Sequence, residues 1–198
     1  MRFVSGLPET RCGRGSTLEV TEHLRAELPK LLQDLEIKRL LDAPCGDLNW
    51  ITRTDLSGLE EYVGIDVSEE MLEHGANREF EPEEFSPKLY EFALVDLVSE
   101  PVPSADAVLC RDFLQHLPAE TVLAVLRNFA SHDVTWLIAT SHEVGENTDI
   151  DRPGDFRRLN LLESPFSFPE PERVIQDPPG SGRILGAWRF DTLGEALA

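Results

Sequence analysis

Short apolar runs separated by amphipathic stretches dominate the first three quarters of the chain. Five of these runs have the length of a buried strand, and each is followed by polar residues. Strands that alternate with helices form a parallel sheet covered on both faces. The expected strands are Ile37–Leu41, Tyr62–Ile65, Leu89–Val95, Ala105–Cys110 and Val134–Thr140.

The stretches between these runs have helical spacing or residues that cap helices. The third crossover, residues 97–104, is the exception, because it is too short and too rich in proline for a full helix. The expected helices run from a cap at Ser16 or Thr17 to Leu35, from about Asp47 for a short distance, from a cap at Ser68, and over Ala119–Ala130 after Pro118.

The pattern changes after Thr140. Residues 141–171 contain several prolines and little periodicity, and an irregular segment of this length in a compact domain is usually functional or disordered. Two late strands, Glu172–Gln176 and Arg183–Phe190, follow with only a turn between them. The predicted fold class is therefore α/β: a Rossmann-like doubly wound, mostly parallel sheet with a C-terminal antiparallel hairpin.

The charge of the chain excludes several classes of partner. The 198 residues include 18 Lys and Arg against 37 Asp and Glu, a net charge of −19, which repels both nucleic acid and anionic membranes. No apolar run approaches the roughly 20 residues needed to span a bilayer, and the N-terminus lacks a signal-peptide core. We therefore expect a cytoplasmic protein that binds no nucleic acid and no membrane.

The turn after the first expected strand carries unusual chemistry. It reads Asp42-Ala43-Pro44-Cys45-Gly46-Asp47, in which Gly46 allows a ligand to approach the backbone closely. Asp66, at the end of the second strand, can bind both hydroxyls of a ribose. A dinucleotide would require a glycine-rich turn for its pyrophosphate, whereas this turn has one glycine and two acids. The pattern favours a cationic nucleoside without phosphates.

These motifs resemble the class I S-adenosylmethionine-dependent methyltransferases, within them a small bacterial or viral-type group with an Asp-Ala-Pro-Cys-Gly-Asp-x-x-Trp motif. The resemblance spans roughly residues 36–142, and the late hairpin fits the family's final strands. The family's loop reads acid-x-Gly-x-Gly-x-Gly, and here Pro44 and Leu48 replace its first and third glycines.

The resemblance implies S-adenosyl-L-methionine as the cofactor and assigns residues to it. Asp42, Ala43, Pro44, Cys45 and Gly46 would hold its amino-acid part. The other implied cofactor residues are Asp66 at the ribose hydroxyls, the neighbouring Val67, Asp96 with Leu97 beside the adenine, and Arg111 beside the methyl group. The whole chain, 1–198, is then one methyltransferase domain, with an N-terminal arm and helix (1–35), a cofactor-binding core (36–142), a substrate-side loop (143–171) and a closing hairpin (172–190).

Methyl transfer is an in-line displacement, and a hydroxyl nucleophile also needs a general base. The candidates are His116, Asp112 and His142, which all follow strands four or five and face the same edge. For His116, a structural role in the turn before the next helix is an equal alternative. A metal ion is not expected, because no spaced cluster of histidines and acids is visible, and three sparse cysteines predict neither a disulfide framework nor structural zinc.

The segment 147–168 is the expected wall of the substrate site. Its arginine, amide and aromatic side chains suit sugars or carboxylated small molecules, although an ordered surface loop is the alternative. The expected contacts are Arg152, Arg157, Asn160 and Phe166. The glycine-rich arm Cys12–Thr17 could fold over the cofactor as a lid, or be a frayed terminus. Asp177-Pro178-Pro179-Gly180 is similar to a motif of DNA amino-methyltransferases but lacks its aromatic residue, so we interpret it as a turn.

The predicted function is methyl transfer to a hydroxyl or amine of a small-molecule or glycan acceptor, by a monomer or homodimer. Two alternatives stay open. One is a methyltransferase that acts on a protein or peptide in an open groove. The other is a non-catalytic subunit that binds the cofactor and tolerates substitution of the candidate bases.

Overall fold

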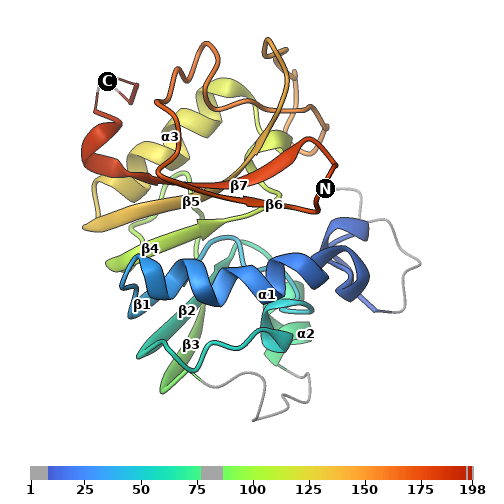
Figure 1. The fold of residues 1–198 in the computed structure, drawn as a ribbon, viewed down its shortest axis with the longest axis vertical. Coiled ribbons are helices and arrows are strands. Elements are labelled where there is room, and N and C mark those ends of the chain that lie inside the picture. The colour runs from blue at the N-terminus through green and yellow to red at the C-terminus, as the bar shows by residue number, and fades with distance from the viewer. Residues whose placement is uncertain (1–8, 77–86, 195, 198) are drawn as a thin grey trace.

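A single mixed sheet organises the described part of the chain, residues 9–76, 87–194 and 196–197 of a computed structural model (Figure 1). Its strand order is β3-β2-β1-β4-β5-β7-β6. The first five strands pair in parallel, and β7 runs antiparallel to both of its neighbours, β5 and β6. The strands are β1 (Arg39–Asp42), β2 (Glu61–Asp66), β3 (Leu89–Leu94), β4 (Ala105–Cys110), β5 (Val134–His142), β6 (Arg173–Gln176) and β7 (Arg183–Arg189).

Helices cover both faces of this sheet, as the alternation of strands and helices predicts. The helices are α1 (Leu18–Asp34), α2 (Glu69–Ala76) and α3 (Ala119–Ala130), and short 3-10 turns lie at Arg14–Ser16, Ile51–Arg53, Leu114–His116 and Phe190–Thr192. Successive side chains of a strand point to opposite faces. Leu40 accordingly packs in the cluster with the leucines of α1, whereas Leu41 packs in the cluster with α3. The α/β fold with a late antiparallel hairpin is confirmed.

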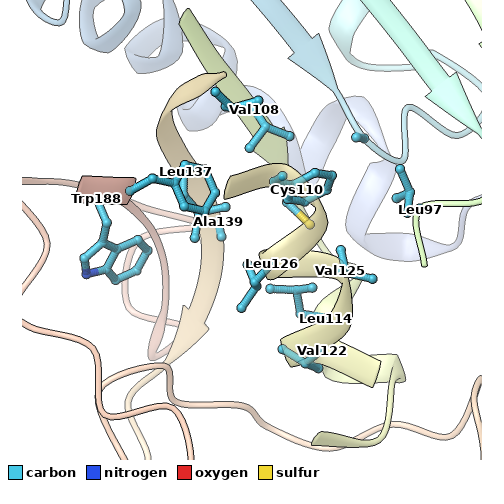
Figure 2. Packing of buried hydrophobic residues seen from close by; sticks show 14 of the residues in the cluster. Leu97, Val108, Cys110, Leu114, Val122, Val125, Leu126, Leu137, Ala139 and Trp188 are labelled. Carbon is cyan, nitrogen blue, oxygen red and sulfur yellow. The ribbon is translucent and has the colours of Figure 1, made fainter. Parts of the chain in front are cut away.

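Two helices show how local sequence sets the boundaries. The hydroxyl of Thr17 accepts a hydrogen bond from the Val20 N–H, which caps α1 at the expected residue. The helix α3 begins after Pro118 and ends at Ala130, as predicted. Figure 2 shows its apolar side chains directed at Val108 and Cys110 of β4.

One expected helix is absent from the described residues. The sequence predicted a short helix from about Asp47, but the structure has only the 3-10 turn Ile51–Arg53 in this crossover. Leu48 adopts a left-handed conformation with a φ of 59°, which interrupts any helix that starts at Asp47. The third crossover has no helix, as expected.

The irregular segment 143–171 is packed against the sheet rather than loosely attached. The His142 N–H donates to the Leu159 carbonyl at 2.8 Å, and the side-chain amide of Asn160 donates to the Val144 carbonyl at 2.7 Å. Leu161 and Phe168 of the same segment are buried in the cluster that includes α3. The segment therefore has a defined course beside the end of β5.

Two further sequence predictions concern membrane-spanning segments and the N-terminal arm. Within the described ranges, none of the helices is both long enough and apolar enough to cross a bilayer. The first eight residues of the predicted N-terminal arm lie outside the described residues.

Candidate active site

The carboxyl ends of the parallel strands meet at one edge, where ligands bind in doubly wound sheets. The loop after β1 is attached to its neighbours there. The Cys45 N–H donates to the Ile65 carbonyl at 2.9 Å, and the Gly46 N–H donates to Oδ2 of Asp66 at 3.0 Å. The structure therefore brings the predicted Asp42–Gly46 loop and Asp66 together.

Gly46 is required at its position for two reasons. Its φ of 60° lies in the left-handed region that favours glycine. A Cβ atom there would also lie 2.6 Å from Sγ of Cys12, a contact too short to form. The loop after β1 thus follows a course that only this glycine allows.

Asp42 and Asp66 form a pair of poorly solvated carboxylates in this loop region. Burial raises the pKa of Asp42 to about 7; the hydrogen bond from the Tyr62 hydroxyl, 2.6 Å from Oδ2, acts against this rise, while Asp66 reinforces it. Burial also raises the pKa of Asp66, although the N–H groups of Ser68 and Gly46 donate to its carboxylate. Two such acids side by side favour a positively charged ligand.

The ends of β2 and β3 add a different surface. Val67 follows Asp66 directly, and its side chain is 66% exposed. The Val95 N–H donates to the Asp66 carbonyl at 3.0 Å, which places the Asp96–Leu97 turn beside it. Asp96 caps that turn through the N–H of Val98, and this hydrogen bond lowers the pKa of its carboxyl. An exposed apolar side chain next to a carboxylate suits a nucleoside.

These groups fit S-adenosylmethionine. Its sulfonium and ammonium groups are cations, its ribose offers two hydroxyls, and its adenine is a flat apolar ring. The carboxylate pair matches the cations, Asp66 is also placed for the ribose hydroxyls, and the exposed Val67 offers an apolar surface. The chemistry of the donor set therefore agrees with the cofactor that the resemblance implies.

Arg111 and Asp112, which follow β4, belong to a network of four buried or partly buried charges. Arg111 Nε donates to Oδ2 of Asp177 at 2.7 Å, and Nη2 reaches Oδ1 at 3.2 Å. Arg183 Nη1 lies 2.8 and 2.9 Å from the two carboxylate oxygens of Asp112. Arg111 is therefore held by an acid, and its guanidinium also lies over the ring of Trp50, at 5.2 Å.

The network argues against Asp112 as a general base. Burial alone would raise the pKa of Asp112, but Arg111 and Arg183 hold it below its ordinary value. Gln115 also donates to its Oδ1 at 3.0 Å. A carboxylate with a lowered pKa and ion pairs on both oxygens is a poor proton acceptor.

Sequence reasoning missed Asp177 and Arg183. The Asp177-Pro178-Pro179-Gly180 stretch is a turn between β6 and β7, as interpreted. Its aspartate, however, is fully buried and lies 66 positions from Arg111 along the chain. Only the strand order, which places β7 next to β5, brings this turn to the edge where β4 ends.

The two histidines both lie close to one aromatic ring. The ring centroid of Phe156 is 5.6 Å from that of His116 and 6.2 Å from that of His142, and Phe156 is 62% exposed. His116 Nδ1 is 3.1 Å from the Asp155 carbonyl. A carbonyl oxygen only accepts, so Nδ1 carries the hydrogen and Nε2 carries the lone pair that can take a proton.

His142 is the more buried of the two. Burial lowers the pKa of its imidazole, so the ring is neutral near pH 7. Its Nδ1 lies 3.3 Å from the backbone of Leu159, which fixes the orientation of the ring. Both histidines are thus positioned by the irregular segment that follows β5.

The four predicted substrate contacts have different surroundings. Phe166 is fully buried in the hydrophobic core, so it supports the segment and cannot line an open site. Arg157 is also buried, donates to the Leu117 carbonyl and pairs with Asp149 at 3.4 Å, and its buried side chain has a lowered pKa. Asn160 connects two parts of the segment. Arg152 alone among the four is exposed.

Comparison with known proteins supports the assignment. Residues 41–132 match the model of a family described as a methyltransferase domain. A comparison with curated proteins found no match in sequence.

Solved structures share the fold over most of the chain. The methyltransferase domain of a bacterial protein, CtHen1-C, superposes with a TM-score of 0.62 at 18% identity, covering 86% of this chain and 98% of that one. The magnesium protoporphyrin IX methyltransferase ChlM of Synechocystis PCC 6803, with bound SAM, gives 0.57 at 20% identity, covering 88% and 86%. The N-methyltransferase NodS of Bradyrhizobium japonicum WM9 gives 0.57 at 14%, covering 86% and 96%.

At these identities the structural likeness establishes the fold. The family match adds the type of domain, and the carboxylates at the strand ends fit the cofactor. The family match and the fold support the expected enzyme class and cofactor: residues 41–132 match a methyltransferase domain, and the carboxylates at the strand ends fit S-adenosylmethionine.

Proposed function

We propose that this protein transfers a methyl group from S-adenosylmethionine to a hydroxyl or amine of a small-molecule or glycan acceptor. The observation that carries this proposal is the exposed Phe156 ring, which lies close to both His116 and His142. An aromatic face beside two imidazoles can bind the apolar face of a small acceptor and remove its proton. The Asp42–Trp50 motif supports placing the chain in the small bacterial or viral-type group.

The cofactor supplies an electrophilic methyl group. The residues that would hold it are those the sequence predicted: Asp42, Ala43, Pro44, Cys45, Gly46, Asp66, Val67, Asp96 and Leu97, with Arg111 at the end of β4. The carboxylates of Asp42 and Asp66 attract the cationic parts of the cofactor and orient its ribose.

His116 is the general base in this proposal. Its Nδ1–H donates to the Asp155 carbonyl, so Nε2 is the nitrogen that accepts the acceptor's proton. His142, which is neutral near pH 7, lies close to the same Phe156 ring and helps to orient the acceptor. Asp112 remains ionised and holds Arg183.

The packing of segment 143–171 supports the proposal of a small acceptor. The Leu161 N–H donates to the Ser141 hydroxyl of β5 at 3.0 Å, so the segment is held close to β5. Arg152 and Arg158 are exposed there and can bind polar substituents. One structural neighbour is named for a porphyrin acceptor and another for N-methylation. Because these names do not agree on one acceptor, the acceptor class proposed for this chain rests on its own residues.

The test uses S-adenosylmethionine with a labelled methyl group and three pools of acceptors: small hydroxyl and amine compounds, glycans, and peptides. Labelling of the first or second pool is the expected result. Labelling of peptides alone would favour the protein methyltransferase. Cofactor binding without labelling of any pool would favour the non-catalytic subunit.

The role of His116 is tested with the acceptor found in this way. His116→Ala should lower kcat by about 10² to 10⁴, the usual contribution of a general base, and leave affinity for S-adenosylhomocysteine unchanged. His132→Ala is the matched control, because His132 lies after α3 and its Nδ1 contacts the Asn128 carbonyl at 2.8 Å. Turnover of His116→Ala equal to that of the control would move the base to His142.

A further inference from the structure

The N-terminal arm, residues 9–17, is attached to the loop that follows β1. The Thr10 hydroxyl donates to Oδ1 of Asp47 at 3.1 Å, and the Arg11 N–H donates to Oδ2 at 2.7 Å. In return the Asp47 N–H contacts Sγ of Cys12 at 3.2 Å. The same sulfur occupies the space beside Gly46 that a Cβ would need. The arm therefore lies directly on the predicted cofactor loop.

The other end of the arm is attached to the loop after β4. Arg111 Nη2 donates to the Gly15 carbonyl at 2.8 Å. Gly15 packs so closely on Asp112 that a Cβ would lie 2.4 Å from Oδ2. Asn49 adds a third attachment, because its amide donates to the Ser16 carbonyl at 2.8 Å.

Between these two ends the arm also contacts α2. Arg11 forms an ion pair with Glu70, in the first turn of that helix, which starts just after Asp66 and Val67. The arm thus contacts the elements that follow β1, β2 and β4. These are three of the four places where the sequence predicts cofactor residues, and in Figure 1 the arm is the darkest blue ribbon.

Asp177 determines how Arg111 meets the arm. Its carboxylate takes Nε and one Nη2 hydrogen of Arg111 in a two-point contact, which fixes the plane of the guanidinium. The remaining direction of Nη2 then meets the Gly15 carbonyl. Asp177 is itself held by Arg183, 3.4 Å from its Oδ1, and is completely buried. Arg111 also lies 3.4 Å from Asp112 and over the ring of Trp50, but Asp177 makes the only two-point contact among those of its described partners.

We propose that residues 9–17 form a strap that closes over the cofactor site, and that Asp177 is the positioning residue that holds the strap closed through Arg111. The strap must open for the cofactor to enter and leave, and it excludes water when closed. The proposal rests on the cofactor, S-adenosylmethionine, and not on the proposed acceptor. Binding measurements alone therefore test it.

The first experiment measures Asp177→Asn with S-adenosylhomocysteine, the product form of the cofactor, by calorimetry. Loss of the charged two-point contact should weaken binding about tenfold. Trypsin, which cleaves after Arg11 and Arg14, reports on the strap by mass spectrometry. The variant should be cleaved faster in the arm than the unmodified protein, with and without ligand. Asp191→Asn, which loses an exposed pair with Arg189, is the matched control and should change neither value.

A second variant separates the strap from the stability of the network. Thr10→Val removes one attachment at the far end of the arm and leaves all four charges in place. It should also speed cleavage of the arm and weaken ligand binding, whereas Thr192→Val, which loses an exposed hydroxyl contact, should not. If Asp177→Asn fails to fold, as judged by circular dichroism, Thr10→Val alone decides.

The combination of the two variants gives the sharpest result. If both act through the strap, the double variant binds S-adenosylhomocysteine about as well as Asp177→Asn alone, because the strap is already open. Effects that multiply, unchanged arm cleavage in either variant, or unchanged affinity would each overturn the proposal. Absence of ligand binding in the unmodified protein would overturn the cofactor assignment and the strap with it.

Discussion

Two pairs of aspartates lie at the same edge of the sheet and differ in their partners. Asp42 and Asp66 are surrounded by a tyrosine hydroxyl and backbone N–H groups, and burial raises the pKa of both. Asp112 and Asp177 are matched by Arg111 and Arg183, and these arginines hold the pKa of Asp112 below its ordinary value.

The difference teaches what each pair does. A buried carboxylate without a cation is costly to ionise, so Asp42 and Asp66 gain most when a positively charged ligand arrives. A carboxylate already paired with arginine gains nothing from such a ligand. The first pair is therefore suited to bind the cofactor, and the second is suited to hold loops together.

The largest expected effect comes from breaking the paired set. Asp177→Ala leaves the buried guanidinium of Arg111 without its acid, which should lower the free energy of unfolding by about 3–5 kcal/mol. Urea denaturation followed by circular dichroism measures this. Asp191→Ala, at an exposed pair, should leave the transition midpoint in place. A loss below about 1 kcal/mol at Asp177 would show that Arg111 finds another partner.

Removal of an acid from the first pair, Asp42 and Asp66, should affect ligand binding more than folding. Asp66→Ala removes a carboxylate from the ribose position, and we expect cofactor affinity to fall by about 1.5–3 kcal/mol. Calorimetry with S-adenosylhomocysteine measures the change, and Asp106→Ala, at the opposite edge of the sheet, serves as the control. Unchanged affinity at Asp66 would remove this turn from the cofactor site.

The raised pKa of Asp42 predicts two pH dependences of opposite sign. The folded protein binds this proton up to about pH 7, whereas the unfolded chain releases it near the ordinary value of 3.8. The contribution of Asp42 to folding stability therefore falls as the pH rises from about 4 to about 7, and is constant above that. The cationic cofactor prefers the ionised form, so its affinity should rise roughly tenfold from one unit below the pKa to one unit above it.

The experiment compares the unmodified protein with Asp42→Asn. The variant should flatten both slopes, one seen in urea denaturation at a series of pH values and the other in calorimetry over the same range. The other charged or titratable groups that act on Asp42 are Tyr62, Asp66 and Arg111, and they are unchanged in this variant. The raised pKa of Asp66 leaves a smaller slope of the same sign. Slopes of unchanged size in Asp42→Asn would assign them to another group.

The smallest effect sharpens the comparison within the first pair. Tyr62→Phe removes the hydroxyl that donates to Asp42 at 2.6 Å, and should destabilise the protein by about 1 kcal/mol. Because that hydrogen bond favours the ionised carboxylate, its loss should move the pKa of Asp42 further up. NMR titration of the aspartate carboxyl measures the direction of the shift. A downward shift would contradict the role of Tyr62.

Most of the fold could be predicted from local pattern. The strand β4 and the helix α3 begin and end at the predicted residues, because apolar runs of strand length and a proline start are local signals. The aspartates that end β1 and β2 were also predicted to meet, since parallel strands share one edge. The helix expected from about Asp47 was wrong because the left-handed conformation of Leu48 has no signature in residue type.

Parts of the candidate site could not be predicted in this way. Phe166 and Arg157 were expected to face a substrate, but the structure buries both. An arginine or phenylalanine in an irregular segment carries no periodicity that tells its inner side from its outer side. Asp177 was interpreted as part of a turn, which it is, but its partner Arg111 follows β4, far away along the chain.

By itself, the sequence determined the class of fold, the position of the acids at the strand ends and the kind of ligand they suit. These properties depend on neighbouring residues and on the geometry that all parallel sheets share. Only the tertiary structure decided which acids are paired with arginine and which are left for a cation. That decision depends on the strand order, which places the β6–β7 turn and the N-terminal arm beside β4, and on the burial that results.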